Sequence, residues 1–262
     1  MSTFWDKIKI GFHEFENALM PEYSCMVCGR ECADTTTLVC ENCKKILVPI
    51  TGHVCKKCGA PVPNTVEICD ECLSNEIHFD MARAAYIFDE QSSQMIYKLK
   101  YFGSKYAAKH IAASMIEPMS RFEKIDIIVP VPLHENRQKQ RGYNQAKLIC
   151  DNLSEMTGIK TNSTILSRKI ETETQTGKNK EERKANVVGA FVVNNKTELP
   201  GKNILIVDDV FTTGATTNEC ARILKKAGAA KVFVLTCLKT TSSLSHTKGK
   251  KNDKSRNRRK NQ

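Results

Sequence analysis

The sequence has no apolar run that approaches the length needed to cross a bilayer, so we expect no membrane span. Near its N-terminus it also lacks the basic segment followed by an apolar stretch that marks a secretory signal. We therefore expect a soluble, cytoplasmic protein. A Gly-Lys-Ser/Thr string is absent as well, which excludes a P-loop for nucleoside triphosphates.

The 262 residues can form one large domain, or one medium domain with a small appendage. Cysteine favours the second arrangement, because nine of the twelve cysteines lie between Cys25 and Cys72. The net charge of +11 is uneven, since residues 248–262 contain eight Lys or Arg and one Asp. We predict an amphipathic helix at 1–20, a cysteine-rich zinc-binding module at 21–78, an α/β domain at 79–240 and a disordered basic tail at 241–262.

Four Cys-x-x-Cys pairs, separated by 11, 11 and 10 residues, dominate the cysteine-rich module. The spacing within each pair lets both thiolates bind one tetrahedral zinc ion, and disulfides are not expected without a secretory signal. Eight thiols can serve two structural zinc ions, but the spacing leaves open which pairs share an ion. The predicted ligands are Cys25, Cys28, Cys40, Cys43, Cys55, Cys58, Cys69 and Cys72.

Several residues around these pairs have structural interpretations. Gly29 and Gly59 allow the tight turns in which backbone N–H groups face sulfur. Cys32 breaks the pattern, and we interpret it as a spare thiol. Residues 4–19 carry an apolar stripe with mixed charges opposite, which favours a helix packed on its own protein over one that binds a membrane or partner. The other cysteines are predicted to be small buried side chains, namely Cys150, Cys220 and Cys237.

A strand, a turn and a helix are predicted in succession between residues 204 and 227. Residues 204–207 form a short apolar run typical of a buried parallel strand, and residues 216–227 show helical spacing. The turn places backbone N–H groups at a helix N-terminus, where partial positive charge favours a phosphate, and its glycine lets the backbone approach the anion. The predicted phosphate-binding residues are Thr212, Thr213, Gly214, Ala215 and Thr216.

Two adjacent acids stand between the predicted strand and this turn. Asp208 and Asp209 would repel a phosphate unless they faced another group. Carboxylates accept hydrogen bonds, so ribose hydroxyls fit this role. The combination predicts a clamp for ribose 5-phosphate, with the two aspartates as the catalytic candidates. The alternative is an ordinary strand-turn-helix with an acidic cluster before the helix.

Two basic segments are candidates for the diphosphate half of such a ligand. Residues 125–131 predict a buried strand, and the loop after it brings Arg137 and Arg141 to the carboxyl end of the sheet. Ligands of open α/β folds bind at that edge. Lys100 follows a predicted helix at 93–99 and is a further candidate. The alternatives are a basic surface loop and a solvated lysine.

A third basic segment is predicted to act as a lid. Residues 167–186 are polar over nearly their whole length and contain Arg183, which we assign to phosphate. The alternative is a disordered segment, but its position inside the domain, before a predicted strand at 187–193, favours a lid. Further strands are predicted at 82–88 and 231–238.

Together these segments resemble the ComF family, whose members are tied to bacterial competence and DNA uptake. The string Ile-Val-Asp-Asp-Val-Phe-Thr-Thr-Gly-Ala-Thr at 206–216 resembles the loop that binds phosphoribosyl pyrophosphate (PRPP) in type I phosphoribosyltransferases. The resemblance extends from Cys25 to about Lys239, whereas Lys178 and the basic tail depart from it. Its other parts are the paired cysteines, Lys-Tyr-x-Gly at 100–103, Val-Pro-Val-Pro-Leu-His at 129–134, Arg-Gly-Tyr-Asn-Gln at 141–145, and Glu182, Arg183 and Asn186.

The resemblance implies an α/β fold with a mostly parallel open sheet of the type I phosphoribosyltransferase type, preceded by a small zinc module. It also implies a protein that binds PRPP with Mg²⁺ and serves competence, DNA uptake and transformation. The alternative is an active phosphoribosyltransferase of nucleotide salvage or base metabolism, although no residue stands out as the one that recognises a base. Single-stranded DNA and other competence proteins are the implied partners, but the tail lacks aromatic residues for base stacking.

Overall fold

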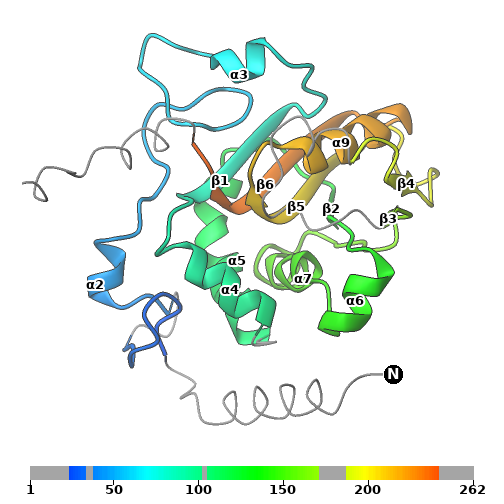
Figure 1. Cartoon of the computed structure of the whole chain (residues 1–262). Helices are drawn as coiled ribbons and strands as arrows, with labels where there is room; N and C mark the ends of the chain where they lie inside the picture. The colour runs from blue at the N-terminus through cyan, green and yellow to red at the C-terminus, as the bar shows by residue number, and fades with distance from the viewer. Residues whose placement is uncertain (1–23, 34–37, 102–104, 171–186, 242–262) are drawn as a thin grey trace, which may run out of the picture.

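A four-stranded parallel sheet lies at the centre of the computed structural model, in the strand order β1-β6-β5-β2 (Figure 1). The strands are β1 (Met81–Ile87), β2 (Ile127–Pro130), β5 (Asn203–Phe211) and β6 (Lys231–Lys239). The structure describes residues 24–33, 38–101, 105–170 and 187–241. The predicted N-terminal helix, most of the predicted lid with Arg183, and almost all of the basic tail lie outside these residues.

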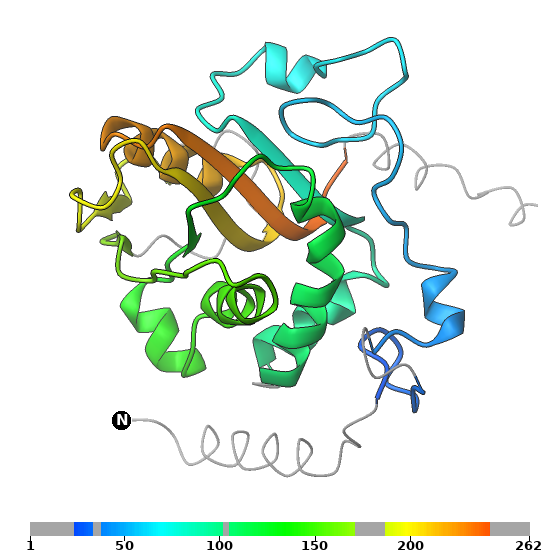
Figure 2. The same ribbon diagram turned by 180° about the vertical axis from the view of Figure 1, so that it is seen from behind.

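Helices cover both faces of this sheet (Figure 1 and Figure 2). One face carries α4 (Ser93–Tyr101), α5 (Lys105–Met119) and α7 (Gln145–Thr157), and the other carries α9 (Ala215–Lys226). One hydrophobic core lies on each face of the sheet, and alternate residues of β5 point into one or the other. Leu205 packs with α5 and α7, whereas Ile206 packs with α9. Every residue from 204 to 207 is 0% exposed, which confirms the predicted strand buried on both faces. None of the helices in the described part of the chain has both the length and the hydrophobicity of a membrane span.

Two cysteine modules pack against different parts of the sheet domain. The first cysteine module (residues 24–33 and 38–44) includes α2 (Glu41–Lys44), and the second cysteine module (residues 54–73) includes α3 (Asp70–Leu73). The first lies beside α4, where Lys98 Nζ donates to the Cys25 carbonyl at 2.7 Å. The second lies against β1, where Ala82 N donates to the Lys57 carbonyl at 2.7 Å.

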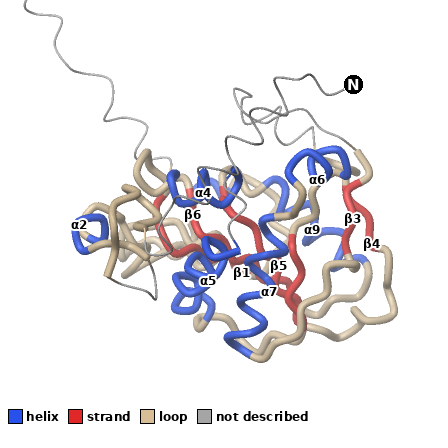
Figure 3. The backbone as a smooth tube through the Cα atoms, turned by 90° about the horizontal axis from the view of Figure 1, so that it is seen from below, coloured by secondary structure: helices blue, strands red, loops and turns tan. Residues whose placement is uncertain are grey.

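Two segments have a different secondary structure from the one predicted, and both lie at the end of the molecule opposite α2 (Figure 3). The predicted basic loop after β2 contains the helix α6 (Glu135–Arg141), because His134 caps it by accepting from Asn136 N at 3.3 Å. The predicted strand at 187–193 shortens to β4 (Phe191–Val193), which pairs antiparallel with β3 (Leu166–Arg168). Residues 187–189 form a turn instead, in which Gly189 N donates to Glu219 Oε1 at 3.0 Å.

Candidate functional site

The turn between β5 and α9 leaves three backbone N–H groups without an acceptor. The N–H groups of Thr212, Thr213 and Gly214 donate to no group among the described residues, and Ala215 N reaches Thr213 Oγ1 at 3.3 Å. A helix N-terminus adds partial positive charge at the same place. The turn therefore has the free donors and the electrostatic field that a phosphate group requires.

Gly214 is needed for the shape of this turn. It caps α9 with φ of 74°, a left-handed conformation that a side chain makes unfavourable. A Cβ at this position would also lie 2.4 Å from Cζ of the Phe211 ring. Backbone conformation and packing thus both select glycine.

The substitution Gly214→Ala is expected to lower the free energy of unfolding by about 2–4 kcal/mol, as strain and overpacking combine. Urea denaturation of the full chain measures this change. Gly158→Ala is the matched control, because Gly158 has φ of 73° but nothing within 4 Å of the added Cβ. It should cost about 1 kcal/mol. Equal losses for the two variants would contradict the role assigned to the Phe211 ring.

Asp208 and Asp209 lie within β5, not after it as predicted. Hydrogen bonding to β6 continues to Phe211 opposite Lys239, so the strand carries both acids. Alternation along β5 turns Asp209 toward α4, where its Oδ2 lies 2.5 Å from Lys100 Nζ. The structure thus brings Lys100 into the same site as the acids, and the ion pair offsets the negative charge of Asp209, which is 6% exposed.

The electrostatic environment of Asp208 differs from that of its neighbour. The residue keeps some exposed surface, but protein densely surrounds its carboxyl group. Burial raises the pKa of Asp208 to about 8, and the Asp209 carboxylate adds to this shift by repelling a second negative charge. Near neutral pH, Asp208 therefore holds a proton that a ligand with hydroxyl donors can displace.

The predicted basic residues lie on and beside α6. Arg141 Nη1 donates to Gln145 Oε1 at 2.7 Å, which holds it at the start of α7. Asn144 caps that helix: its Oδ1 accepts from Ala146 N, and its Nδ2 donates to the Val131 carbonyl, which fixes the segment to the end of β2. The pKa of Arg168 is lowered chiefly by burial and also by the positive charge of Arg137, which lies close to it.

Arg168 is a basic residue that the sequence does not single out. It ends β3 and stacks over the Phe191 ring at 5.3 Å from the centroid, with the charge of Asp208 also acting on it. A single arginine in a polar run carries no local signal. Only the packing of the β3–β4 pair against α9 shows that it belongs near the acids.

The eight predicted zinc ligands form two groups, and each group joins consecutive pairs. One contains Cys25, Cys28, Cys40 and Cys43, and the other contains Cys55, Cys58, Cys69 and Cys72, with all four sulfur atoms of a group within 4.8 Å of one another. The structure therefore answers the pairing question that spacing left open. Cys32 belongs to neither group.

The geometry of both groups fits zinc. Cys28 Sγ and Cys40 Sγ lie 3.8 Å apart, and Cys58 Sγ and Cys69 Sγ lie 3.6 Å apart. A tetrahedral ion with Zn–S bonds near 2.3 Å would separate its sulfur ligands by about 3.8 Å. Burial raises the pKa of Cys58 to about 11, so a cation is needed to hold such thiols as thiolates.

Two parts of the chain match known protein families. Residues 15–73 match the family described as a double zinc ribbon domain, and residues 104–259 match the family described as a phosphoribosyl transferase domain. The chain is 29% identical to Competence protein F of Haemophilus influenzae over 221 residues, covering 81% of this chain and 95% of that protein.

Two other relatives show similar coverage. The chain is 29% identical to Competence protein ComFC of Bacillus subtilis over 214 residues, covering 77% of this chain and 84% of that protein. It is 30% identical to DNA utilization protein YhgH of Salmonella typhimurium over 218 residues, covering 80% of this chain and 94% of that protein. Each of these matches spans more than three quarters of this chain.

Proposed function

We propose that this chain, which belongs to the ComF family of phosphoribosyltransferase-domain proteins, binds PRPP at the carboxyl end of β5. The observation that carries the proposal is one continuous segment that joins an acidic pair to a turn with free N–H groups. The turn would hold the 5-phosphate, and Asp208 and Asp209 would accept hydrogen bonds from the ribose hydroxyls.

The pyrophosphate group would lie toward the basic residues, namely Lys100, Arg137, Arg141 and Arg183. Lys100 faces Asp209 from α4, whereas Arg137 and Arg141 belong to α6, so the proposed cations come from separate elements. Arginine suits this role because its planar fork binds phosphate oxygens in pairs. Mg²⁺, held chiefly by the phosphate oxygens of PRPP, would offset the charge of the leaving group.

If the protein is a transferase, a nitrogen nucleophile forms a bond to the anomeric carbon of PRPP. The bond from that carbon to the pyrophosphate oxygen breaks, and pyrophosphate leaves with the electron pair. The proton of the attacking N–H group passes to solvent. Positive charge develops on the ribose during this exchange, and the two aspartates would stabilise it through their negative charge. Most of the rate gain would come from positioning the two reactants.

Isothermal titration of the full chain tests the binding proposal. PRPP is expected to bind with a stoichiometry of one in the presence of Mg²⁺ and far more weakly after EDTA is added. The zinc content of the EDTA-treated protein is measured to verify that only Mg²⁺ has been removed. Ribose 5-phosphate and pyrophosphate, each offering half of the ligand, should bind more weakly than PRPP. Absence of Mg²⁺-dependent PRPP binding by correctly folded protein would rule the proposal out.

The affinity for PRPP is expected to rise with pH up to about 8, by as much as tenfold per pH unit. Ribose hydroxyls favour the ionised carboxylate, so binding below the pKa of Asp208 must release its proton. The stability of the free protein should change in the opposite direction to the affinity. Because the pKa of Asp208 is raised to about 8 in the folded state, the free energy of unfolding should fall as pH rises from about 4 to about 8. Titration in buffers of different ionisation enthalpy measures the released proton.

Asp208→Asn is the control for this pH dependence, since PRPP itself also titrates. The variant should keep only the slope that belongs to the ligand. An identical slope in both proteins would show that Asp208 does not lose a proton on binding.

The biological role proposed for this site is competence for DNA uptake and transformation. Its support is the names of the relatives, two of which are competence proteins and one a DNA utilization protein. A transformation assay with a chromosomal copy carrying Asp209→Asn connects the site to the role. Undiminished transformation with this allele would separate PRPP binding from competence.

A further inference from the structure

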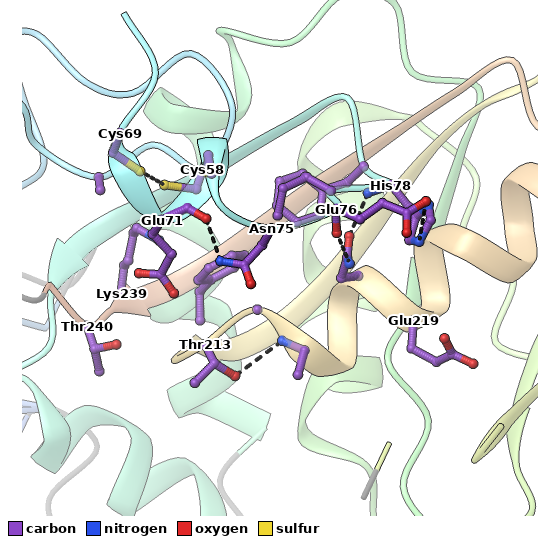
Figure 4. A pocket seen from close by; sticks show the side chains of 18 of the residues that line it. Cys58, Cys69, Glu71, Asn75, Glu76, His78, Thr213, Glu219, Lys239 and Thr240 are labelled. Carbon is purple, nitrogen blue, oxygen red and sulfur yellow. Dashed lines mark hydrogen bonds and ion pairs between the residues drawn. The ribbon is translucent and has the colours of Figure 1, made fainter. Parts of the chain in front are cut away.

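A buried lysine of the sheet domain lies beside the second zinc group, which consists of Cys55, Cys58, Cys69 and Cys72. Lys239, the last residue of β6, lines a cavity of about 510 Å³ together with three of these cysteines, and Figure 4 shows it on the same side of that cavity as Cys58 and Cys69. Only 4% of Lys239 is exposed, and its Nζ lies 3.8 Å from the centroid of the Phe211 ring. A buried ammonium requires negative charge or an aromatic face close to it. The thiols and the ring provide both.

Lys239 and the thiols of the second zinc group influence one another electrostatically. Burial raises the pKa of Cys58, and the positive charge of Lys239 opposes this increase more than any other group does. Burial lowers the pKa of Lys239, whereas negative charge on Cys58 and Glu71 raises it. The sheet domain therefore places a cation where thiolates bound to zinc need one.

The first zinc group has a lysine from the sheet domain as well, and its ligands are Cys25, Cys28, Cys40 and Cys43. Lys98 of α4 donates from Nζ to the Cys25 carbonyl at 2.7 Å. A Cβ on Gly29 would lie 3.7 Å from the same Nζ. Burial lowers the pKa of Lys98, and negative charge on Cys25, Cys28 and Cys43 acts in the opposite direction. Lys98 thus lies against the turn that carries the first Cys-x-x-Cys pair.

An arginine accompanies the lysine at each zinc group. At the second group, Arg83 of β1 donates from Nη1 to the Cys55 carbonyl at 3.5 Å. Burial lowers the pKa of Arg83, while negative charge on Cys55 and Cys58 raises it. At the first group, a hydrogen bond to Cys28 raises the pKa of Arg30, which is exposed. Each group therefore has two cations close to it.

Two cations match the charge of a zinc ion that is bound by four thiolates. Zn²⁺ and four negative sulfur ligands sum to a net charge of about −2. Burying such an anion against a protein domain is unfavourable unless positive charge nearby compensates it. Both lysines belong to the sheet domain and not to the cysteine modules, so this compensation joins the two parts of the protein.

We propose that Lys98 and Lys239 compensate the charge of the two zinc groups, one lysine for each group, and that they thereby stabilise zinc binding and hold each cysteine module against the sheet domain. The two lysines act through the thiolates and are not ligands of the metal. The inference concerns the zinc groups alone and does not depend on PRPP binding.

Chelator competition with the zinc-loaded full chain tests this inference. Lys239→Met should lose one of its two zinc ions at a chelator concentration at least about tenfold lower than the wild-type protein does. Lys98→Met should also lose one ion early, with a smaller shift of about threefold, because Lys98 is only partly buried. The matched controls are Lys231→Met, at the start of β6, and Lys109→Met, on α5, and each should shift the midpoint less than about twofold.

The ion that is lost is identified by ¹¹³Cd NMR of the cadmium-loaded protein, in which each group gives its own resonance. Cys58→Ser removes a ligand of the second group and so assigns the two resonances. In Lys239→Met the chelator should first remove the resonance of the second group, and in Lys98→Met that of the first. Lys239→Arg keeps the positive charge and should retain the second ion to within about threefold of the wild-type protein.

Three results would overturn the inference. The first is retention of both ions by Lys239→Met and Lys98→Met at the chelator concentrations that the wild-type protein withstands. The second is simultaneous loss of both ions in each variant, which indicates general destabilisation and not compensation at one group. The third is equal zinc affinity of Lys239→Arg and Lys239→Met, which would assign the lysine a packing role. Lys98→Met decides the question at a partly exposed position, so the test does not depend on the folding of the Lys239 variants.

Discussion

Replacing Asp208 and Asp209 together by asparagine is expected to weaken Mg²⁺-dependent PRPP binding at least 100-fold. Hydrogen bonds to charged groups contribute about 1.5–3 kcal/mol each, and the ribose offers hydroxyls to both carboxylates. The change also removes the partner of Lys100 Nζ, which lies 2.5 Å from Asp209 Oδ2. Isothermal titration of the full chain measures the affinity.

Loss of affinity in this variant must be separated from loss of folding. Asp208→Asn removes repulsion between neighbouring acids, so it should preserve or raise stability, while Asp209→Asn breaks an ion pair and should lower it. The melting temperature of each single variant checks these signs. Asp151→Asn is the matched control, because Asp151 is an exposed partner of Lys147 on α7 and should leave PRPP affinity unchanged. A folded double variant that binds within threefold of the wild-type protein would refute the assignment of the acids.

Removing one ligand of the second zinc group by Cys58→Ser is expected to reduce zinc content from two ions per chain to one. The melting temperature should fall by about 10 °C or more, since zinc binding supplies much of the folding free energy of such modules. Atomic emission spectroscopy and calorimetry measure the two quantities. Cys32→Ser is the matched control, because Cys32 lies outside both groups and should leave two ions bound.

The physical reason for so large an effect is that the second cysteine module shares structure with the sheet domain. Ala82 N of β1 donates to the Lys57 carbonyl, and a Cβ on Gly59 would lie 2.6 Å from the Ala82 carbonyl oxygen. Cys58 packs in the same apolar core as Phe79 and Ile206. Release of the ion should therefore also loosen β1. An unchanged melting temperature after loss of one zinc ion would show that the module folds independently.

The acidic pair and the turn after it could be predicted because their signal is local. The apolar run at 204–207, the acids and Gly214 adjoin one another, and each residue type is selected by backbone geometry close to it. The predicted secondary structure of this segment differs from the structure at the end of the strand. Pairing with β6 extends β5 to Phe211, and such pairing depends on a partner more than 20 residues away in the chain.

From the sequence alone we could predict the eight cysteines that form two groups fitting zinc, the position of the turn proposed to bind phosphate, and the parallel α/β sheet after the cysteine-rich module. Only the tertiary structure decided that consecutive pairs share each ion, that Lys100 meets Asp209, and that Lys239 is buried beside the second cysteine module. Spacing and periodicity report short-range geometry. Contacts between α4, β5, β6 and the modules arise instead from the burial of apolar faces that are distant in the chain, and no local pattern encodes where those faces meet.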